Sequence, residues 1–335
     1  MFIFDGSKLP ELPIEVLLVG DDQTLRELAP EYQGRKVAVD GYYQRAQDRD
    51  FIVLSGRVSS KTLTTIAYHE LTHYFLSRAL TRPPTWLSEG LSQYFSAAAI
   101  HNEEINVGAI LPEQMQFLRN SRLIPTGEFF AVNTSSPYYN ESLKANMFYS
   151  QSWAFVHFMM HGEYAPQFKR YLEALSKGDA DFLNFMGVSE RSLENTFSNY
   201  LRVMIQHARG ARTKLKGQPW TMKVEAIPDA EAHITIAEIF LAAGRLADAQ
   251  QHLKTVDMAG QEYPRAFYYQ GILASIAGDN ISARELFVDA LLDPQLGTRA
   301  AVQLVRMGEL HIPQYVRCWS RLQQLEPILR MCIGP

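Results

Sequence analysis

Two adjacent helices that carry histidine and glutamate side chains constrain the fold of this chain most strongly. A helix is predicted over residues 60–80, with Ser59 or Ser60 as its N-cap. Pro83-Pro84 ends this helix, because a proline disfavours helical backbone at the residue before it. A second helix is predicted over residues 85–100. Since the Pro-Pro turn reverses the chain, the second helix must return past the first.

The first helix contains the segment His69-Glu70-Leu71-Thr72-His73. Residues four apart lie on one face of a helix, about 6 Å along its axis, so the two imidazoles can converge on one cation. Zinc takes nitrogen and oxygen ligands at about 2.0–2.2 Å in a tetrahedral set. Glu70 lies one position along, so its carboxylate leaves the helix beside the metal. A general base needs this position to reach the attacking water.

A catalytic zinc needs a third protein ligand, and Glu89 is the candidate, sixteen residues after His73. It falls in the first full turn of the second helix, among apolar residues that include Trp86, Leu87, Leu91 and Tyr94. A carboxylate in so apolar a stretch is costly to bury unless it is paired or bound to a metal. We therefore predict that His69, His73 and Glu89 bind Zn²⁺.

The alternative is that His69, Glu70 and His73 form an exposed polar face without a metal. Their helix also carries Ile66, Leu71 and Phe75, which predicts that much of it is buried. Two histidines and two glutamates on buried, adjacent helices favour the metal site over a solvated surface.

Four other polar residues are candidates near the site. Gln93 lies four residues after Glu89 and is a candidate partner for the far nitrogen of a ligand histidine, with a plain helix-surface glutamine as the alternative. His157 lies in a strongly apolar predicted helix, 146–161, which favours a core histidine over a ligand. His101 and His161 flank turns and are expected to be exposed.

The N-terminal part of the chain has an α+β pattern. Short strands are predicted at 13–20, 37–39 and 51–54, and form a small mixed sheet. Asp21 or Asp22 can cap a short helix after the first strand. Beyond residue 145, further helices are predicted over 146–161 and 166–208.

Residues 209–224 are rich in Gly, Lys, Arg and Pro and have no apolar period, which predicts a boundary between domains 1–210 and 225–335. The second domain is predicted to be all-α, with a 34-residue period: Ala237, Gly244, Ala249 and Leu253 recur as Gly271, Gly278, Ala283 and Phe287. This period resembles the tetratricopeptide repeat, with a third, degenerate pair at 297–309 and 314–330. Two ordinary helical hairpins of equal length are the alternative.

Composition excludes several classes of protein. The chain has 335 residues, 47% of them hydrophobic and 20% charged, which favours two globular domains over disorder. A net charge of −4 argues against nucleic acid as a partner.

Cys318 and Cys332 form either one disulfide or two thiols and do not indicate a compartment. No apolar run reaches the roughly 18 residues that span a bilayer, so no membrane span is expected. The N-terminus lacks signal-peptide features, so a cytoplasmic location is expected, or a periplasmic or secreted one if a signal peptide has been removed.

The two helical segments together resemble the gluzincin branch of zinc metallopeptidases. The resemblance rests on His69-Glu70-Leu71-Thr72-His73 and on Trp86-Leu87-Ser88-Glu89-Gly90-Leu91-Ser92-Gln93-Tyr94. It implies that His69, His73 and Glu89 hold zinc in a zincin-like domain and that Glu70 is the general base.

The chain is especially similar to a bacterial group of peptidase-MA-like domains, which have a segment like Phe148-Tyr149-Ser150-Gln151-Ser152-Trp153-Ala154-Phe155-Val156-His157. The likeness covers about residues 13–205. The gap between His73 and Glu89 is shorter than in the best-studied gluzincins and fits this group better. Related proteins tend to carry an extra strand, a helix and often a signal peptide ahead of the first strand, so a truncated start is expected.

The resemblance implies peptide hydrolysis by a water that zinc and Glu70 activate together. Gluzincins often use a Tyr or His to stabilise the oxyanion, and Tyr149 is the candidate here, with Tyr138 and Tyr139 as competitors. The strand at 51–54 is the expected sheet edge for an extended substrate. The repeats are expected to bind a peptide or protein partner, or only to brace the catalytic domain. A catalytically inactive scaffold and a hydrolase of non-peptide amides are the alternative functions.

Overall fold

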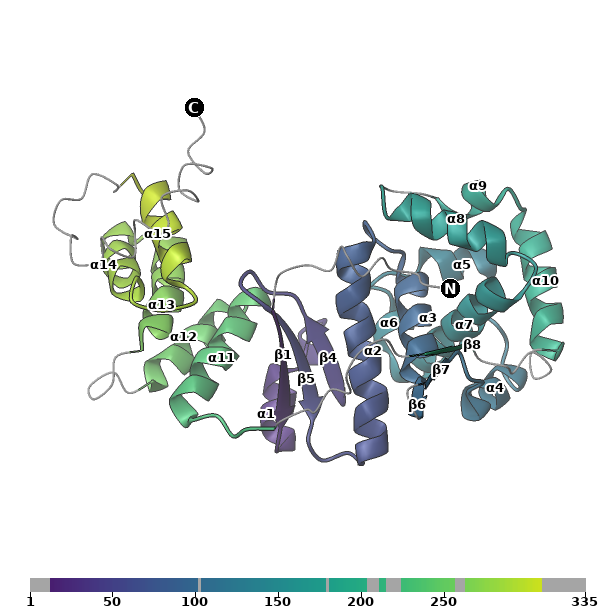
Figure 1. The fold of residues 1–335 in the computed structure, drawn as a ribbon, viewed down its shortest axis with the longest axis horizontal. Helices are drawn as coiled ribbons and strands as arrows, with labels where there is room; N and C mark the ends of the chain where they lie inside the picture. The colour runs from purple at the N-terminus through teal and green to yellow at the C-terminus, as the bar shows by residue number, and fades with distance from the viewer. Residues whose placement is uncertain are drawn as a thin grey trace. The chain divides into compact units, whose positions relative to one another are not determined.

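The structure, a computed structural model, describes residues 13–101, 104–178, 181–203, 211–214, 224–256 and 263–308. The chain divides into two compact units, residues 1–221 and 222–335, and this division falls within the predicted boundary segment. The described residues combine many helices with a few short strands, so the fold is α+β in the broad sense (Figure 1). The predicted helix 314–330 and both cysteines lie outside the described residues.

A three-stranded sheet opens the N-terminal unit, in the order β1-β5-β4. Strand β5 (Asp50–Ser55) lies in the centre, parallel to β1 (Ile14–Val19) and antiparallel to β4 (Gly41–Gln44). The prediction that the strand at 51–54 is a free edge is therefore wrong. Every residue of β5 is buried, as a near-continuous apolar run in a central strand should be, and β4 forms the edge instead.

The prediction of a strand at 37–39 is also wrong. A two-stranded hairpin lies just before these residues instead. It consists of β2 (Glu31–Tyr32) and β3 (Arg35–Lys36). Gln33 and Gly34 form its turn with φ angles of 51° and 72°, and two-residue hairpin turns of this kind require positive φ at both positions. The chain has therefore already reversed before it reaches Val37.

The helices that carry the predicted metal ligands, α2 (Ser60–Ala79) and α3 (Thr85–Ser96), begin where the sequence predicts. Helix α1 (Asp22–Leu28) is capped by Asp21, and α2 by Ser59. Helix α2 packs against β4 and β5 on one side and against α3 on the other, so it lies between the sheet and the helices (Figure 1). Helix α3 ends four residues before the predicted Ile100, because the chain there enters strand β6.

A second three-stranded sheet has the order β6-β7-β8, from β6 (Ala99–His101), β7 (Glu104–Val107) and β8 (Ala211–Lys214). All its pairings are antiparallel, with Val107 opposite Ala211. Strand β8 lies in the segment 209–224, which the sequence predicts as the boundary between the domains. That part of the boundary therefore belongs to the fold of the N-terminal unit.

Helix α7 (Ser142–His161) forms the core of the N-terminal unit and begins four residues before the predicted start. Thirteen of its twenty residues are buried, which suits a helix that is covered on most sides. It packs against α3 at Gly90, where a Cβ would lie 2.4 Å from the Ser152 carbonyl oxygen, so only glycine allows this approach. The remaining helices of this unit are α4 (Pro112–Arg119), α5 (Thr126–Ala131), α6 (Pro137–Asn140), α8 (Ala165–Leu175), α9 (Phe182–Met186) and α10 (Glu190–Val203).

The described part of the C-terminal unit contains two helical hairpins and a further helix. The hairpins are α11 (Asp229–Ala242) with α12 (Leu246–Thr255), and α13 (Pro264–Ile276) with α14 (Asn280–Ala290); α15 (Gly297–Arg306) follows. Gly244 and Gly278, 34 residues apart, turn the two hairpins with φ angles of 74° and 81°. Arg245 N donates to the Phe240 carbonyl at 2.8 Å, and Asp279 N to the Ala274 carbonyl at 2.9 Å. The same turn therefore recurs with the predicted period.

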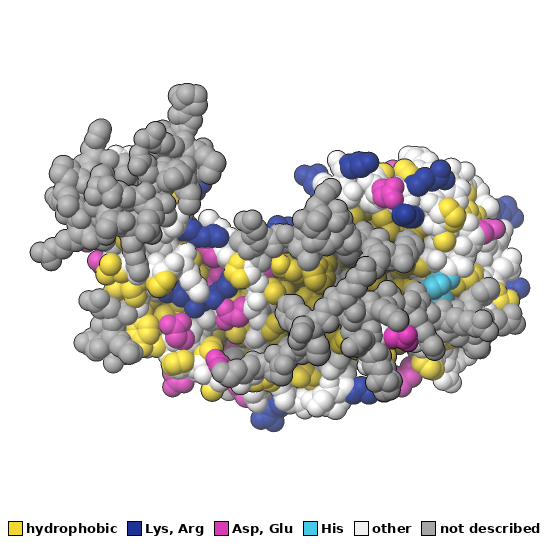
Figure 2. Space-filling view, in the orientation of Figure 1, with side chains coloured by type: hydrophobic (Ala, Val, Ile, Leu, Met, Phe, Trp, Pro, Cys, Tyr) yellow, Lys and Arg dark blue, Asp and Glu magenta, His cyan; other side chains and the backbone are white. Residues whose placement is uncertain are grey.

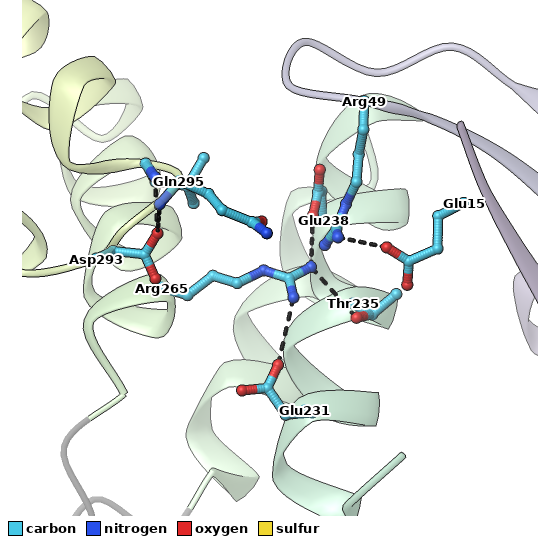
Figure 3. A network of polar contacts seen from close by, with 9 residues as sticks. Glu15, Arg49, Glu231, Thr235, Glu238, Arg265, Asp293 and Gln295 are labelled. Carbon is cyan, nitrogen blue, oxygen red and sulfur yellow. Dashed lines mark hydrogen bonds and ion pairs between the residues drawn. The ribbon is translucent and has the colours of Figure 1, made fainter. Parts of the chain in front are cut away.

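Arg265 connects the two hairpins (Figure 3). Its guanidinium, on α13, donates to Glu231 at 3.3 Å, Thr235 at 3.3 Å and Glu238 at 3.0 Å, all on α11. Glu231 and Arg265 lie 34 residues apart, so equivalent positions of successive hairpins face each other. Glu238 is buried, and such a paired charge favours one register of the helices over others.

Two observations concern membrane-spanning helices and the charge of the surface. No described helix combines the length and the apolar character that a bilayer crossing needs. On the face drawn in Figure 2, Lys and Arg side chains lie among Asp and Glu side chains rather than in one continuous basic surface.

Candidate metal centre

Three donor atoms from α2 and α3 converge in the N-terminal unit. The Nε2 atoms of His69 and His73 lie 3.1 Å apart, and Glu89 Oε2 lies 3.3 Å from the first and 3.5 Å from the second. Ligands at about 2.0–2.1 Å around a tetrahedral zinc lie about 3.3–3.4 Å from one another. The three atoms therefore already have the separations of three corners of a zinc tetrahedron. Among the described residues, this is the one group of three or more such side chains that could hold a metal ion.

The electrostatics of these residues favour a cation between them. Glu89 is only 2% exposed, and neutral imidazoles would direct their Nε2 lone pairs at its carboxylate. Burial alone lowers the pKa of His73, but the charges of Glu89 and Glu70 and the hydrogen bond with Glu89 raise it to about 9. Burial alone raises the pKa of Glu89, but the His73 charge and hydrogen bonds from both histidines bring it well below its ordinary value. Either a proton or a metal ion can supply the positive charge.

Two neighbouring hydroxyl groups orient the donor atoms. Ser88 Oγ lies 3.0 Å from His73 Nδ1, and when Nδ1–H donates to it, Nε2 keeps its lone pair for a cation. The Tyr139 hydroxyl donates to Glu89 Oε1 at 3.0 Å, which leaves Oε2 toward the histidines. Of the two readings left open for Gln93, its bonds do not support a partner for a ligand histidine, since its Oε1 accepts from Gln114 Nε2 at 3.2 Å. The sequence analysis did not name Ser88. Its position directly before Glu89, in the turn that faces α2, was a signal that could have identified it.

Glu70 lies beside the three donor atoms but is not one of them. It is 8% exposed and lines the same cleft as His73 and Glu89. Its charge contributes to raising the pKa of His73. The structure therefore places Glu70 where the motif predicts a base, next to the histidine face of α2.

The three candidate tyrosines have different surroundings. All three pack against the hydrophobic core. Tyr139 and Tyr149 also line the cleft, with ring centroids 6.0 Å apart, whereas Tyr138 is not part of the lining. Burial and the charges of Glu89 and Glu70 raise the pKa of Tyr149, so its phenol stays protonated and is a hydrogen-bond donor at neutral pH. Tyr139 is already hydrogen-bonded to Glu89.

The site opens into a cleft of about 1310 Å³. Its walls come from the β2–β3 hairpin, β4, α2, α3 and the residues before α7. A cavity of this size exceeds the roughly 300–1,000 Å³ of most small-molecule pockets, so it can take a segment of polypeptide.

The other histidines of this unit lie away from the metal centre. His157 is fully buried, with Nδ1 2.8 Å from the Tyr200 hydroxyl, as a core histidine should be. His161, expected to be exposed, is half-buried instead, with Nε2 2.9 Å from the Tyr94 hydroxyl. The expected exposure is wrong because α7 continues through His161 and keeps it against α3. The side chain of His101 lies outside the described residues.

Comparison with known proteins adds one family. A family model described as "Protein of unknown function (DUF1570)" matches residues 61–179. The matched segment contains His69, Glu70, His73, Glu89 and Tyr149 and excludes the β1-β5-β4 sheet and the C-terminal unit. No curated protein and no solved structure is significantly similar to the chain.

Proposed function

We propose that the N-terminal unit is a zinc-dependent peptidase of the gluzincin type, in which His69, His73 and Glu89 hold the metal. The observation that carries this proposal is the separation of the three donor atoms, 3.1, 3.3 and 3.5 Å, which fits a tetrahedral zinc. The donor set of two imidazoles and one carboxylate is also a set that catalytic zinc uses. When bound, zinc supplies Lewis-acid polarisation of the water nucleophile and of the substrate carbonyl.

Glu70 is the general base in this proposal. Its carboxylate lines the cleft beside His73, accepts a proton from the attacking water and passes it to the leaving amine. Because Glu70 is not among the converging donor atoms, it is free to exchange this proton.

Tyr149 stabilises the oxyanion of the tetrahedral intermediate. Its protonated phenol lines the cleft near Glu70 and Glu89. Donors that are already aimed at the developing negative charge stabilise the transition state most. Tyr139 is assigned a positioning role, because its hydroxyl holds Glu89.

Strand β4 is the proposed site of substrate pairing. It pairs with β5 on one side only within the described residues, and its residues Gly41, Tyr42 and Tyr43 line the cleft. An extended peptide can add to such an edge through backbone hydrogen bonds. These bonds do not depend on side chains, so β4 favours a peptide over other amide substrates.

The C-terminal unit is proposed to be tetratricopeptide-like and to bind a peptide or protein partner. The recurrence of the hairpin turns at Gly244 and Gly278 supports this assignment. Close packing at Gly271 supports it too, since a Cβ there would lie 2.8 Å from the Phe287 ring. Stacked hairpins of this kind present a continuous surface that proteins use for binding.

A single substitution tests the catalytic proposal. Glu70→Gln should keep stoichiometric zinc, measured by elemental analysis, and lose hydrolysis of a peptide library by at least about a hundredfold, because general-base catalysis contributes 10²–10⁴-fold. Glu173→Gln, at an exposed position of α8, is the matched control and should leave both properties unchanged. Activity that survives Glu70→Gln would show that Glu70 is not the base, and zinc-free protein would contradict the metal site.

A further inference from the structure

We propose that one end of the cleft recognises a carboxylate group of the substrate through Arg45 and Arg82, so that the enzyme prefers acidic peptides. This inference rests on the proposed peptidase function and names its substrate class. It begins from the charges in the cleft wall outside the metal centre.

Outside the metal centre, the described part of the cleft wall has four charged groups, and two of them have an ionic partner. Arg78 pairs with the fully buried Asp50, and Glu31 pairs with Lys36 at 2.6 Å. Arg45 and Arg82 also line the cleft, are exposed, and have no ion-pair partner among the described residues. Away from the metal centre, the wall therefore carries two positive charges without an ionic partner, whereas the carboxylate of Glu70 lies at the metal centre itself.

The two arginines follow the ends of two elements that pack against each other, β4 and α2. Two contacts show that β4 and α2 run in the same direction. Gly41, at the start of β4, packs closely against Ile66, whereas the hydroxyl of Tyr43, further along β4, lies 2.9 Å from the Oγ of Ser77, further along α2. Arg45 directly follows β4, and Arg82 follows the C-terminal end of α2. The two positive charges therefore come from neighbouring chain segments.

The distance from the metal centre fits a peptide subsite. Helix α2 ends at Ala79, six residues after His73, which is about 9 Å along the helix axis. An extended peptide covers this distance with about three residues. A glutamate or aspartate about three residues from the cleaved bond would therefore reach the arginines.

The backbone of Arg82 is a separate indication of function. Its φ angle is 48°, a left-handed conformation that is unfavourable for any residue with a Cβ and that Gly or Asn tolerates better. Among the described residues, Gln33 and Arg82 are the non-glycine residues with positive φ, and both line this cleft. Thr81 N donates to the Leu175 carbonyl at 3.1 Å and holds the turn in place. Residues held in such conformations concentrate at ligand sites.

The chemistry of arginine selects the ligand. A guanidinium group offers paired N–H donors that match a carboxylate in a bidentate arrangement, and its charge attracts acidic side chains. The attraction should weaken with salt, because exposed charges are screened.

The test uses full-length, zinc-loaded protein and peptides that differ only in Glu, Gln or Lys two to four residues from the cleaved bond. We expect kcat/KM for the Glu peptide to exceed that for the Lys peptide at least fivefold at low ionic strength. Arg82→Gly and Arg45→Ala should each remove most of this preference and leave the Gln peptide unchanged. Glycine suits the left-handed backbone, so Arg82→Gly should fold at least as well as the wild type. Arg119→Ala, on the exposed face of α4, is the matched control and should keep the preference.

A binding measurement separates this inference from the peptidase proposal. The zinc-loaded Glu70→Gln protein should bind the Glu peptide more tightly than the Lys peptide in fluorescence anisotropy, and Arg82→Gly should abolish the difference. Cleavage without any Glu preference, or a preference that survives both arginine substitutions, would overturn the inference and leave the peptidase intact. A third outcome separates the two proposals in the other direction. If the Glu peptide binds selectively through Arg82 but the zinc-loaded wild type cleaves no peptide, the peptidase proposal is overturned and the carboxylate site is supported.

Discussion

Glu89 illustrates how much a single buried carboxylate says about its surroundings. It is almost completely buried among apolar side chains, yet two imidazoles and one phenol point at its oxygens. Burying such a charge is costly unless partners offset the cost. Glu89 Oε2 and the two histidine Nε2 atoms lie at similar distances from one another, as the ligands of one metal ion do, while Tyr139 holds the other carboxylate oxygen.

Proton competition at His73 gives a prediction about zinc affinity. The raised pKa of His73, about 9 against 6.5, means that in metal-free protein its proton stabilises the fold below pH 6.5, and that this contribution is lost as pH rises through 9. Zinc must displace this proton. Apparent zinc affinity, measured by competition with a chelator of known pH dependence, should therefore rise about tenfold per pH unit from pH 7 to 9. Affinity that does not change over this range would contradict the prediction. Glu89→Gln, measured with the same chelator, should show weak affinity with little change above pH 7.

The sequence predicts some site residues and misses others for a physical reason. His69, Glu70 and His73 share one helix, so their spacing alone places them. Ser88 was not among the predicted residues, although its place next to Glu89 was a signal. Tyr139 was named as a candidate for another role, and its bond to Glu89 could not be predicted because it comes from a short helix fifty residues away. The sequence left two roles open for Gln93 because α4, which supplies its partner Gln114, has no local signal that relates it to α3.

At the scale of the elements, the connection between β4 and α2 sets the geometry of the cleft. Asp50, at the start of β5, is fully buried and accepts from the Tyr43 hydroxyl of β4 at 2.6 Å and from Arg78 of α2. The Tyr43 hydroxyl also lies 2.9 Å from Ser77, four residues after His73. The proposed substrate edge is thereby tied to the helix that carries the histidines.

Asp50→Asn tests this connection. Removing one charge of a buried pair leaves the other uncompensated, so the free energy of unfolding in urea should fall by about 3 kcal/mol. Zinc content should not change. KM for peptides should rise more than kcat falls, because β4 would shift relative to α2, the helix that carries His69 and His73. Lys169→Ala breaks the exposed pair with Glu173 and should cost less than about 1 kcal/mol. A loss for Asp50→Asn no larger than in this control would contradict the role of Asp50.

Strands were harder to predict than helices in this chain. The long helices α2 and α7 follow from capping residues, proline and apolar content, which are local signals. Strand β4, with the sequence Gly-Tyr-Tyr-Gln, has no clear alternation, and its place at the edge depends on pairing with β5. Sheet order is a property of non-local contacts, so the sequence alone did not reveal which strand is the edge.

The whole molecule consists of two units that each have their own core. In the C-terminal unit, Phe287 is 1% exposed and packs on Gly271 and near Tyr268. Phe287→Ala should therefore destabilise this unit by about 3–5 kcal/mol, as large-to-small core substitutions do. In calorimetry only one of two transitions should shift, and zinc content should stay the same. Ile281→Ala, at a 72% exposed position of the same unit, should shift neither transition. Two transitions that move together would show that the units unfold as one.

The boundary between the units was predictable only in part. The lack of an apolar period over 209–224 indicates a division, and the division after Thr221 falls within that segment. Strand β8 was not predictable, because Ala211–Lys214 pairs with β7, about a hundred residues earlier, and no local pattern shows this.

The pairing of β8 with β7 means that the end of the N-terminal unit is fastened to its middle. A shortened chain that stopped at residue 210 would keep every proposed metal ligand but would leave one side of β7 without a partner. Unpaired strands of this kind recruit strands from other molecules, so such a fragment would tend to self-associate. Attempts to isolate the N-terminal unit should therefore carry the chain past Lys214.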